Sequence, residues 1–570
     1  MEKWVVTAKK ADFQEISRKY GIDPVIARII RNRDITEDAA IDQYLNGTLA
    51  DIPSWKSLKD IEKAVNIISE KIDQGSRMRI IGDYDIDGVT ATYILLKGFK
   101  RLGANVDTYI PDRIADGYGI HDHLIQRAKD DGIDLIVTCD NGISAVDQIA
   151  FANSLGMTVV VTDHHEIPFE DTEKGRTYKL PAAAAIINPK QPDCAYPSKN
   201  ICGAVVAMKL VYALYERYGI PEKEKEEYLE PAAIATVGDI MDLQGENRIL
   251  VKEGLARLPY TKNKGLKALI RAIGLENQNI SSYDIGFRLG PCINASGRLD
   301  TAMRSLALLQ CEDEEEAARL ANDLKTLNDS RKALTEQGTE TAYKLIEESD
   351  LKNDKVMVVF LPECHESLAG IIAGRIREKY HKPAFVLTRG EKSVKGSGRS
   401  TESYSMYEEL VKCDSLLLQY GGHPMAAGLS IAEENVDAFR RQLNENCTLT
   451  EEDLIPKIVI DVPMPISYIN DHLIRQLSVL EPFGKGNGKP LFAQKNLRVL
   501  KVGIYGKNQN TVKLQLMDDS GAVMDGLYWG EAKEFAEFAR NHETISVTYY
   551  PRINSYMGRE SLQIVIQNYC

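Results

Sequence analysis

Short runs of apolar residues alternate with longer amphipathic segments between residues 59 and 218. The apolar runs are typical of buried strands, and the segments between them repeat apolar positions at helical spacing. Strands that alternate with helices of about ten residues predict βαβ units and a parallel sheet. The expected strands are 78–81, 106–110, 135–138, 158–162 and 183–187, and the expected helices are 59–72, 89–102, 121–129, 144–155 and 204–218.

The pattern changes after residue 311. Residues 312–348 are rich in Ala, Leu, Glu and Lys, and Ala317, Leu320 and Leu324 recur at helical spacing. This segment predicts one long amphipathic helix that Gly338 could interrupt. Either the helix is buried against the first domain or it links that domain to a second. A new strand pattern that begins at residue 356 favours the link.

Short β-rich segments separated by turn residues follow from residue 457 onward. Five or six such strands fit a small barrel or sandwich, and an oligonucleotide-binding (OB) barrel is one candidate. Tyr505, Tyr528 and Trp529 could stack on nucleobases there, although aromatic residues of small barrels more often belong to the core. The expected strands are 458–462, 497–503, 511–517, 523–529, 545–550 and 562–566.

Together the patterns predict an α/β fold with a C-terminal β-barrel, since 570 residues are too many for one core. The expected parts are a helical extension without chemistry (1–50), a parallel-sheet domain (51–311), a linker helix (312–352), a second α/β domain (353–455) and an OB-like barrel (456–570).

Composition restricts the class of protein. Apolar residues at 44% and charged residues at 27% are typical of a soluble globular protein. No apolar run approaches the ~18 residues that a membrane span needs, and the N-terminus shows no secretory signal. Nine cysteines without a CxxC pair argue against a zinc ribbon or a disulfide framework, so we expect a cytoplasmic protein with reduced thiols. Nothing resembles a coiled-coil seam, so we expect a monomer.

Four motifs with acidic or imidazole side chains each follow an apolar run. Three of them end expected parallel strands, whose carboxyl ends gather ligands at one edge of a sheet. The first motif has three aspartates at alternate positions, which would point the same way in an extended segment. The motif residues are Asp83, Asp85, Asp87, Asp140, His164, His165, Asp239 and Asp242.

Several carboxylates at one edge repel one another unless cations neutralise them. Four or more carboxylates with a histidine suit two Mn²⁺ or Mg²⁺ ions better than they suit zinc. Two such ions about 3.5–4 Å apart clamp phosphoryl oxygens and generate hydroxide at neutral pH. Each motif alone could be a turn or a helix cap. The net charge of −13 does not exclude a nucleic-acid substrate, because binding depends on where the basic groups lie.

The series DYDIDG, CDNGIS, TDHHE and VGDIMD resembles the DHH phosphoesterase superfamily, whose members hold two Mn²⁺ or Mg²⁺ ions for phosphoester hydrolysis. The resemblance implies that His165 orients ligands or contacts the scissile phosphate. Several members carry a histidine where this chain has Ile81, which implies a weaker ligand set for one ion. The implied ligands are Asp85, Asp87, Asp140 as the bridge, His164 and Asp239, while Asp83 shares the first motif and which two of its three aspartates ligate stays open.

Residues 365–380, 396–400 and 421–428 resemble the DHH-associated domain. In GSGRS, the glycine-rich backbone predicts an anion nest, and Arg399 predicts a bidentate contact to phosphate, with a glycine-rich turn as the alternative. His423, between glycine and proline, could contact substrate or cap a turn.

Three further segments resemble the RecJ family of single-strand-specific 5′→3′ DNA exonucleases: PDRIADGYG (111–119), INASGRLD (293–300) and EPFGKGN (481–487). This likeness runs from about residue 50 to 570, although Gly488 departs from the proline that usually follows. The resemblance implies that Arg113, Ser397 and Arg399 hold the 5′-terminal phosphate or first nucleotide, and that Arg298 contacts the adjacent backbone.

The sequence therefore predicts a metal-dependent exonuclease that releases 5′-mononucleotides from single-stranded DNA in repair and recombination. A single-strand-binding protein and a helicase are the candidate protein partners that the resemblance implies. Two alternatives stay open: a phosphodiesterase for short RNA or cyclic dinucleotides, and an inactive single-strand-binding scaffold.

Overall fold

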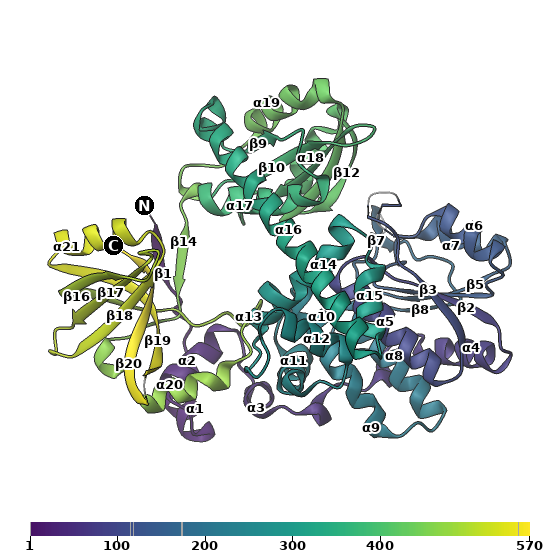
Figure 1. The fold of residues 1–570 in the computed structure, drawn as a ribbon, viewed down its shortest axis with the longest axis horizontal. Helices are drawn as coiled ribbons and strands as arrows, with labels where there is room; N and C mark the ends of the chain where they lie inside the picture. Colours follow the sequence, from purple (N-terminus) through teal and green to yellow (C-terminus); the bar gives the residue numbers. More distant parts are fainter. Residues whose placement is uncertain (1, 114–115, 118, 173–174, 557) are drawn as a thin grey trace.

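The computed structural model describes residues 2–113, 116–117, 119–172, 175–556 and 558–570. Three lobes lie around the long helix α16: a parallel-sheet domain, a second α/β domain and a β-barrel (Figure 1). Among the described residues, no helix has the length and apolar character needed to cross a membrane. The nine cysteines are free thiols.

The first domain contains a five-stranded sheet in which every pair of neighbours is parallel, with the order β3-β2-β4-β5-β8. Alternate strand residues face opposite sides, so α4, α5 and α8 pack on Ile80 and Val137, while α6 and α7 pack on Ile136 and Val161. The prediction of a parallel sheet is confirmed. The elements are β2 (Arg77–Ile81), β3 (Asn105–Tyr109), β4 (Leu135–Cys139), β5 (Thr158–Thr162), β8 (Ala185–Ile187), α4 (Ile61–Asp73), α5 (Ile86–Arg101), α6 (Asp122–Asp130), α7 (Val146–Ser154) and α8 (Gly203–Arg217).

The strand order places a topological switch point between β2 and β4. The chain leaves β2 toward β3 on one side and later returns to β4 on the other. Ligands of open parallel sheets bind in the crevice outside the carboxyl ends of the strands at such a point. The first two acidic motifs directly follow β2 and β4, so the topology brings them to this crevice.

A helical region follows the sheet and ends in α16 (Glu314–Glu347), which is one continuous helix. The interruption considered at Gly338 is wrong. A Cβ there would lie 2.7 Å from Ile372 Cδ1 of α17, so the missing side chain allows close helix packing rather than a break. The other helices of this region are α10 (Leu229–Gly238), α11 (Gly245–Arg257), α12 (Lys264–Ala272), α14 (Gly290–Leu299) and α15 (Met303–Gln310), and α17 (Ala369–Tyr380) belongs to the second α/β domain.

The second α/β domain contains a mixed sheet with the order β12-β13-β11-β10-β9, in which only β9 and β10 run parallel. Helix α17 packs on this sheet and on the C-terminal half of α16, so α16 joins both domains. The strands are β9 (Met357–Phe360), β10 (Ala384–Arg389), β11 (Val394–Arg399), β12 (Leu417–His423) and β13 (Ala426–Ile431).

The C-terminal strands form a closed barrel, because β16 pairs with β17 on one side and with β19 on the other. Tyr505 and Trp529 are exposed on it, whereas Tyr528 packs on Phe535 and Tyr569. The elements are β16 (Phe492–Tyr505), β17 (Thr511–Met517), β18 (Val523–Trp529), α21 (Ala532–Asn541), β19 (Thr544–Tyr556) and β20 (Arg559–Tyr569).

The N-terminal region, predicted as a helical extension (1–50), contains the helices Phe13–Tyr20, Pro24–Asn32 and Asp38–Asn46, and it packs on the barrel lobe. Strand β1 (Lys3–Val6) pairs in parallel with β14 (Lys457–Ile460), and Ile26, Ile29 and Ile41 share a core with the barrel. Polar residues surround the four residues of β1, which left no strand signal in the local pattern.

Arg248 fastens this lobe to the first domain. Its buried guanidinium donates hydrogen bonds to the carbonyl oxygens of Tyr44, Val479 and Leu480, at 3.0, 2.7 and 3.0 Å, and lies 3.9 Å from the Tyr44 ring centre. These carbonyl oxygens come from the N-terminal region (Tyr44) and from the segment before the barrel (Val479 and Leu480), so one side chain links both to α11.

Replacing Arg248 with Ala should lower the free energy of unfolding by about 3 kcal/mol or more, because three carbonyl oxygens, two in buried and one in a partly buried bond, lose their donor. Chemical denaturation followed by circular dichroism measures the loss. The control Arg475→Ala removes an exposed arginine of the same lobe and should change stability by less than about 0.5 kcal/mol. Equal losses in both variants would contradict the role of Arg248.

Candidate active site

The first acidic motif connects the end of β2 directly to the start of α5. Asp85 is the N-cap of α5, and its Oδ1 accepts hydrogen bonds from the backbone N–H groups of Asp87 and Gly88 at 2.9 and 3.1 Å. The expectation that the three aspartates point the same way from an extended segment is therefore wrong. Because Asp87 already lies in the first helical turn, its side chain points elsewhere than those of Asp83 and Asp85.

The acidic and histidine side chains gather in three overlapping triplets. Within each triplet, one ligand atom per residue lies within 4.8 Å of the others. Asp140 belongs to two triplets and His164 to two, so the triplets form one continuous cluster. The triplets are Asp83–Asp85–Asp140, Asp87–His164–Asp239 and Asp140–His164–His165.

The N-terminus of α8 holds Asp87. Backbone N–H groups of Gly203 and Ala204 donate to its two carboxylate oxygens at 2.6 and 2.8 Å, where the helix dipole also favours negative charge. The absence of a side chain at Gly203 also lets Asp140 lie against the start of α8, because a Cβ at Gly203 would lie 2.8 Å from the Asp140 Cβ.

Asp140 lies at the centre of the cluster. It is buried directly after β4 in the left-handed region, with φ 59°, which few residues other than glycine adopt and which often marks a functional site. Burial, and then the neighbouring charges of Asp87 and Asp85, raise the pKa of Asp140 well above its usual value. Its Oδ1 accepts no hydrogen bond from the described residues.

His164 presents Nε2 to three carboxylates. Nε2 lies 3.1 Å from Asp140 Oδ1, 3.6 Å from Asp87 Oδ2 and 3.7 Å from Asp239 Oδ2. None of these contacts has hydrogen-bond geometry within the described chain. Burial lowers the pKa of His164, which favours the neutral imidazole that binds metal ions. Buried polar atoms that converge without bonding to one another fit a cation between them.

His165 is oriented by Asp163, a residue that the sequence interpretation left out of the site. Asp163 Oδ1 lies 2.8 Å from His165 Nδ1, and Oδ2 accepts from the Ile143 backbone N–H at 2.9 Å. Burial disfavours the charge of Asp163, but the bond to His165 outweighs it and holds its pKa at about 2. Burial alone would lower the pKa of His165, yet Asp163 raises it to about 9.

Asp239 reaches the cluster from α10, where it is the C-cap, rather than from a strand. Burial, and then the charges of Asp87 and Asp85, raise its pKa to about 8. Asp242 faces away toward Lys485 Nζ, 3.7 Å distant, and belongs to none of the triplets. Oxygen ligands with one or two imidazoles at these spacings fit Mn²⁺ or Mg²⁺.

The segment 293–300 holds the first acidic motif in place. Asn294 Oδ1 accepts from the Ile86 backbone N–H at 2.7 Å, and a Cβ at Gly297 would lie 2.3 Å from the Tyr84 carbonyl oxygen. Arg298 is the one residue of this segment for which the sequence predicts a role. Arg298 is largely buried, donates to the Ser367 carbonyl at 3.0 Å, and has a pKa lowered to about 10 by burial and by Arg113.

Ser397 and Arg399 lie across from the cluster in the second domain. The prediction of a glycine-rich anion nest is wrong, because residues 394–399 form β11, which pairs with β10 and β13 and so uses its backbone in the sheet. The N-terminus of α17 lies against these two side chains instead, and its Ala369 N–H already bonds to the Glu366 carbonyl. A Cβ at Gly370, in its first turn, would lie 2.8 Å from Arg399 Nη2 and 3.4 Å from Ser397 Oγ.

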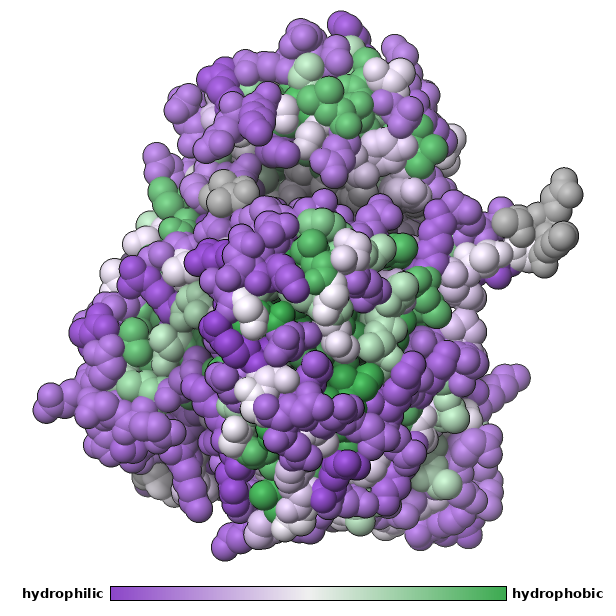
Figure 2. Space-filling model, turned by 90° about the vertical axis from the view of Figure 1, so that its right-hand side faces the viewer, coloured by the Kyte–Doolittle hydropathy of each residue, from purple (hydrophilic) through white to green (hydrophobic). Residues whose placement is uncertain are grey.

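A cavity of about 670 Å³ joins the two halves. Tyr84 and Arg113 line it from the first domain, with the Arg113 guanidinium 5.1 Å from the Tyr84 ring centre, and Ser367 and Ser397 line it from the second. A recess between the upper lobe and the larger body is visible in Figure 2. His423 is exposed at the end of β12 and is not among the described lining residues. Residues 114, 115 and 118 of the segment 111–119 lie outside the described chain.

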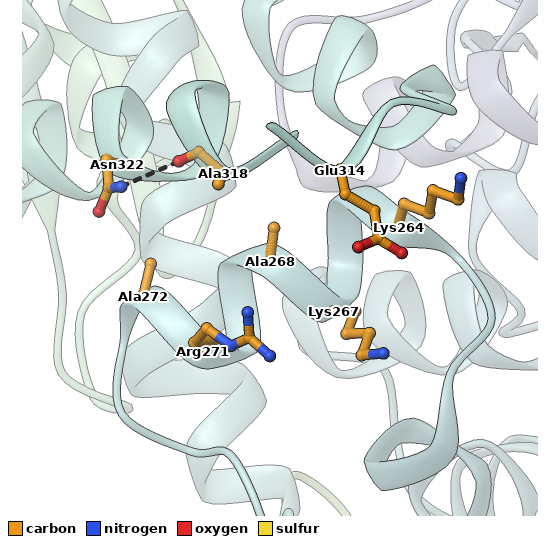
Figure 3. Close-up of a pocket in the computed structure, with 8 residues that line it drawn as sticks. All are labelled: Lys264, Lys267, Ala268, Arg271, Ala272, Glu314, Ala318 and Asn322. Carbon is orange, nitrogen blue, oxygen red and sulfur yellow. Dashed lines mark hydrogen bonds between the residues drawn. The ribbon is translucent and has the colours of Figure 1, made fainter. Parts of the chain in front are cut away.

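A recess of about 180 Å³ between α12 and α16 has a different character (Figure 3). Two of its three cations are already paired: Lys264 donates to the Glu312 carbonyl at 2.6 Å, and Arg271 lies 2.9 Å from Glu276. None of the sequence-predicted site residues is among the eight that line it, so we place the chemistry at the acidic cluster.

Three family models match successive parts of the chain. The model of the DHH family, N-terminal domain, matches residues 77–236, that of the DHHA1 domain matches 353–448, and that of the RecJ OB domain matches 460–568. The fold and the acidic cluster therefore define a protein of the DHH class.

Proteins that are similar along the whole chain identify a narrower family within this class. The single-stranded-DNA-specific exonuclease RecJ of Bacillus subtilis is 34% identical, over 99% of this chain and 70% of that protein. The RecJ of Escherichia coli is also 34% identical, over 96% of both chains. The crystal structure of RecJ in complex with Mn²⁺ from Thermus thermophilus covers all of this chain and 79% of its own, with 30% identity and a TM-score of 0.84. The chain belongs to the RecJ family.

The pKa of Asp239 predicts how the metal-free protein responds to pH. Because its folded value of about 8 lies above the unfolded value of ~3.9, its contribution to stability is lost as pH rises between them. In the presence of a chelator, Asp239→Asn should therefore unfold at a higher temperature than wild type near pH 8, and the difference should shrink near pH 5. Added Mn²⁺ should reverse the order at pH 8. A difference that does not vary with pH would contradict this account.

Proposed function

We propose that the chain is a metal-dependent nuclease that hydrolyses single-stranded DNA from the 5′ end and releases nucleoside 5′-monophosphates. The observation that carries the proposal is the acidic cluster facing an arginine- and serine-lined cavity across one interdomain recess. Similarity along the whole chain to exonucleases named for single-stranded DNA supports it. The cofactors we propose are two Mn²⁺ or Mg²⁺ ions, as in the RecJ structures with Mn²⁺ and Mg²⁺ from Thermus thermophilus.

The triplets support a division of ligands between the two ions. Asp83, Asp85 and Asp140 would hold one, and Asp87, His164 and Asp239 the other, with Asp140 close enough to bridge them. Both ions would polarise a phosphate and lower the pKa of a water molecule. On this assignment all three aspartates of the first motif would be ligands. Asp83 and Asp85, which precede α5, would hold one ion, and Asp87, in the first turn of α5, would hold the other.

The chain's own residues would orient the strand. Arg399 and Ser397, which lie together beside Gly370, offer donors for the 5′-terminal phosphate, and Arg113 offers a second guanidinium from the cavity that Ser397 also lines. His165, whose pKa Asp163 raises to about 9 against the effect of burial, would bring a positive charge to the scissile phosphate. Arg298 would contact the adjacent backbone, and His423 would contact the strand only outside the cavity.

The barrel supports a single-stranded substrate, because OB barrels bind unpaired strands through stacking and backbone contacts. We further propose that the protein acts as a monomer in the cytoplasm, in DNA repair and recombination. A single-strand-binding protein and a helicase are its proposed partners.

A substrate panel with Mn²⁺ tests the activity. We expect rapid release of mononucleotides from 5′-phosphorylated single strands, slower release from 5′-hydroxyl strands, and little from blunt duplex or dinucleotides. Arg399→Ala should remove most of the advantage of the 5′-phosphate, about 10-fold to 100-fold in kcat/KM, because one charge-assisted bidentate contact is lost. Asp140→Ala should abolish turnover.

The same panel separates the alternatives. Preference for dinucleotides would instead indicate a phosphodiesterase for short substrates. Binding of single strands without any turnover would indicate a scaffold. Arg389→Ala, which removes an exposed arginine paired with Glu433 on the same sheet, serves as the matched control.

A further inference from the structure

A groove of about 1230 Å³ lies between the first domain and the segment that leads into the barrel. Residues 482–485 and Tyr550 line one side, and residues 280–283, Gly286 and Phe287 line the other. Gly238 and Ile240, which flank Asp239, also line it. The groove therefore begins beside the acidic cluster and extends toward the barrel.

Unusually exposed apolar side chains line this groove. Tyr260 is 83% exposed, Ile240 66%, Phe287 65% and Tyr283 64%. The Tyr283 and Phe287 rings stack with centres 4.7 Å apart and planes 26° from parallel. Single exposed apolar residues are ordinary, but four of them along one groove indicate a surface that a ligand covers.

Strained backbone occurs at the same place. Ile240 has φ 55°, a left-handed conformation in which a β-branched residue is a genuine outlier. Ile240 N–H bonds to the Val237 carbonyl at 3.2 Å and Met241 N–H to the Thr236 carbonyl at 3.1 Å, which fix this turn after α10. Strain of this kind persists where the surroundings impose it, often at ligand sites.

The charges of the groove are mainly positive, which fits a polyanion. Lys252, Lys485 and Lys489 line it with one carboxylate, that of Glu481, and Lys489 Nζ lies 3.9 Å from the Tyr550 ring centre. Aromatic faces interleaved with lysines are what a single strand needs, because bases stack on the rings and phosphates pair with the cations. Apolar side chains alone would suit a peptide equally, so the lysines favour the nucleic acid.

We propose that this groove binds the part of the DNA strand on the 3′ side of the scissile phosphate, with nucleobases stacked on Tyr283 and Phe287. The inference rests on the proposed function, which puts the 5′-phosphate in the interdomain cavity. Tyr84, between Asp83 and Asp85, lines that cavity, whereas residues on both sides of Asp239 line the groove. The acidic cluster therefore lies between the two, and a strand that crosses it reaches the groove.

The double variant Tyr283→Ala/Phe287→Ala tests the inference. For a 5′-phosphorylated strand of about 20 nucleotides, KM should rise about 10-fold to 100-fold with kcat little changed, since stacking is lost. For a strand of about three nucleotides, kcat/KM should stay the same, because it engages only the cavity and the cluster. Tyr283→Phe should restore part of the affinity over Tyr283→Ala, and Tyr468→Ala, an exposed tyrosine outside the groove, should have no effect.

Photo-crosslinking of strands that carry 5-iodouracil gives a readout independent of turnover. We expect crosslinks to Tyr283 or Phe287 from positions on the 3′ side of the first nucleotides. Crosslinks confined to the barrel, equal losses on both strand lengths, or an unchanged KM on the long strand would each overturn the inference. A wild-type protein without nuclease activity would overturn the proposed function instead, and the crosslinks would still decide whether the groove binds DNA.

Discussion

Repulsion among buried carboxylates is the constraint that the rest of the structure accommodates. Several aspartates meet outside β2 and β4, where the strand order opens a crevice. The fold stabilises two of them locally: the N-terminus of α5 holds Asp85, and that of α8 holds Asp87. Asp140 Oδ1 accepts no such bond from the described residues, and burial, with the charges of Asp87 and Asp85, raises its pKa. Divalent cations would neutralise these charges, so the charged cluster fits a metal site.

The other domains are positioned around this cluster. Continuous helix α16 holds the second domain so that Ser367 and Ser397 face Tyr84 and Arg113 of the first across one cavity. The segment 481–487 and Arg248 fasten the barrel lobe to α11, close to Asp239. One strand can therefore contact the cavity, the metal ligands and the groove in sequence. The domain arrangement thus determines which phosphoester reaches the cluster.

Periodicity in the sequence was sufficient to predict the parallel sheet, the long helix and the barrel, because burial imposes regular spacing on each. Periodicity did not predict the local features of the site that depend on tertiary contacts. Alternate aspartates suggested one shared face, but Asp85 caps a helix that begins at Ile86. Gly396 and Gly398 suggested a nest, yet a Cβ at either would meet core side chains such as Leu387 and Phe385.

Residues that position other residues of the site were harder to predict from the sequence. Asp163 lies within the DHH motif, but only the structure shows that it orients His165. Asn294 and Gly297 act on a loop about two hundred residues away in the chain, which no local pattern predicts. The most direct test of the metal site is the number of Mn²⁺ ions bound per chain, measured by equilibrium dialysis and located by anomalous scattering. We expect two ions in the wild-type protein and fewer in Asp140→Asn. Two ions retained in that variant, or fewer than two in the wild type, would contradict the central role of Asp140.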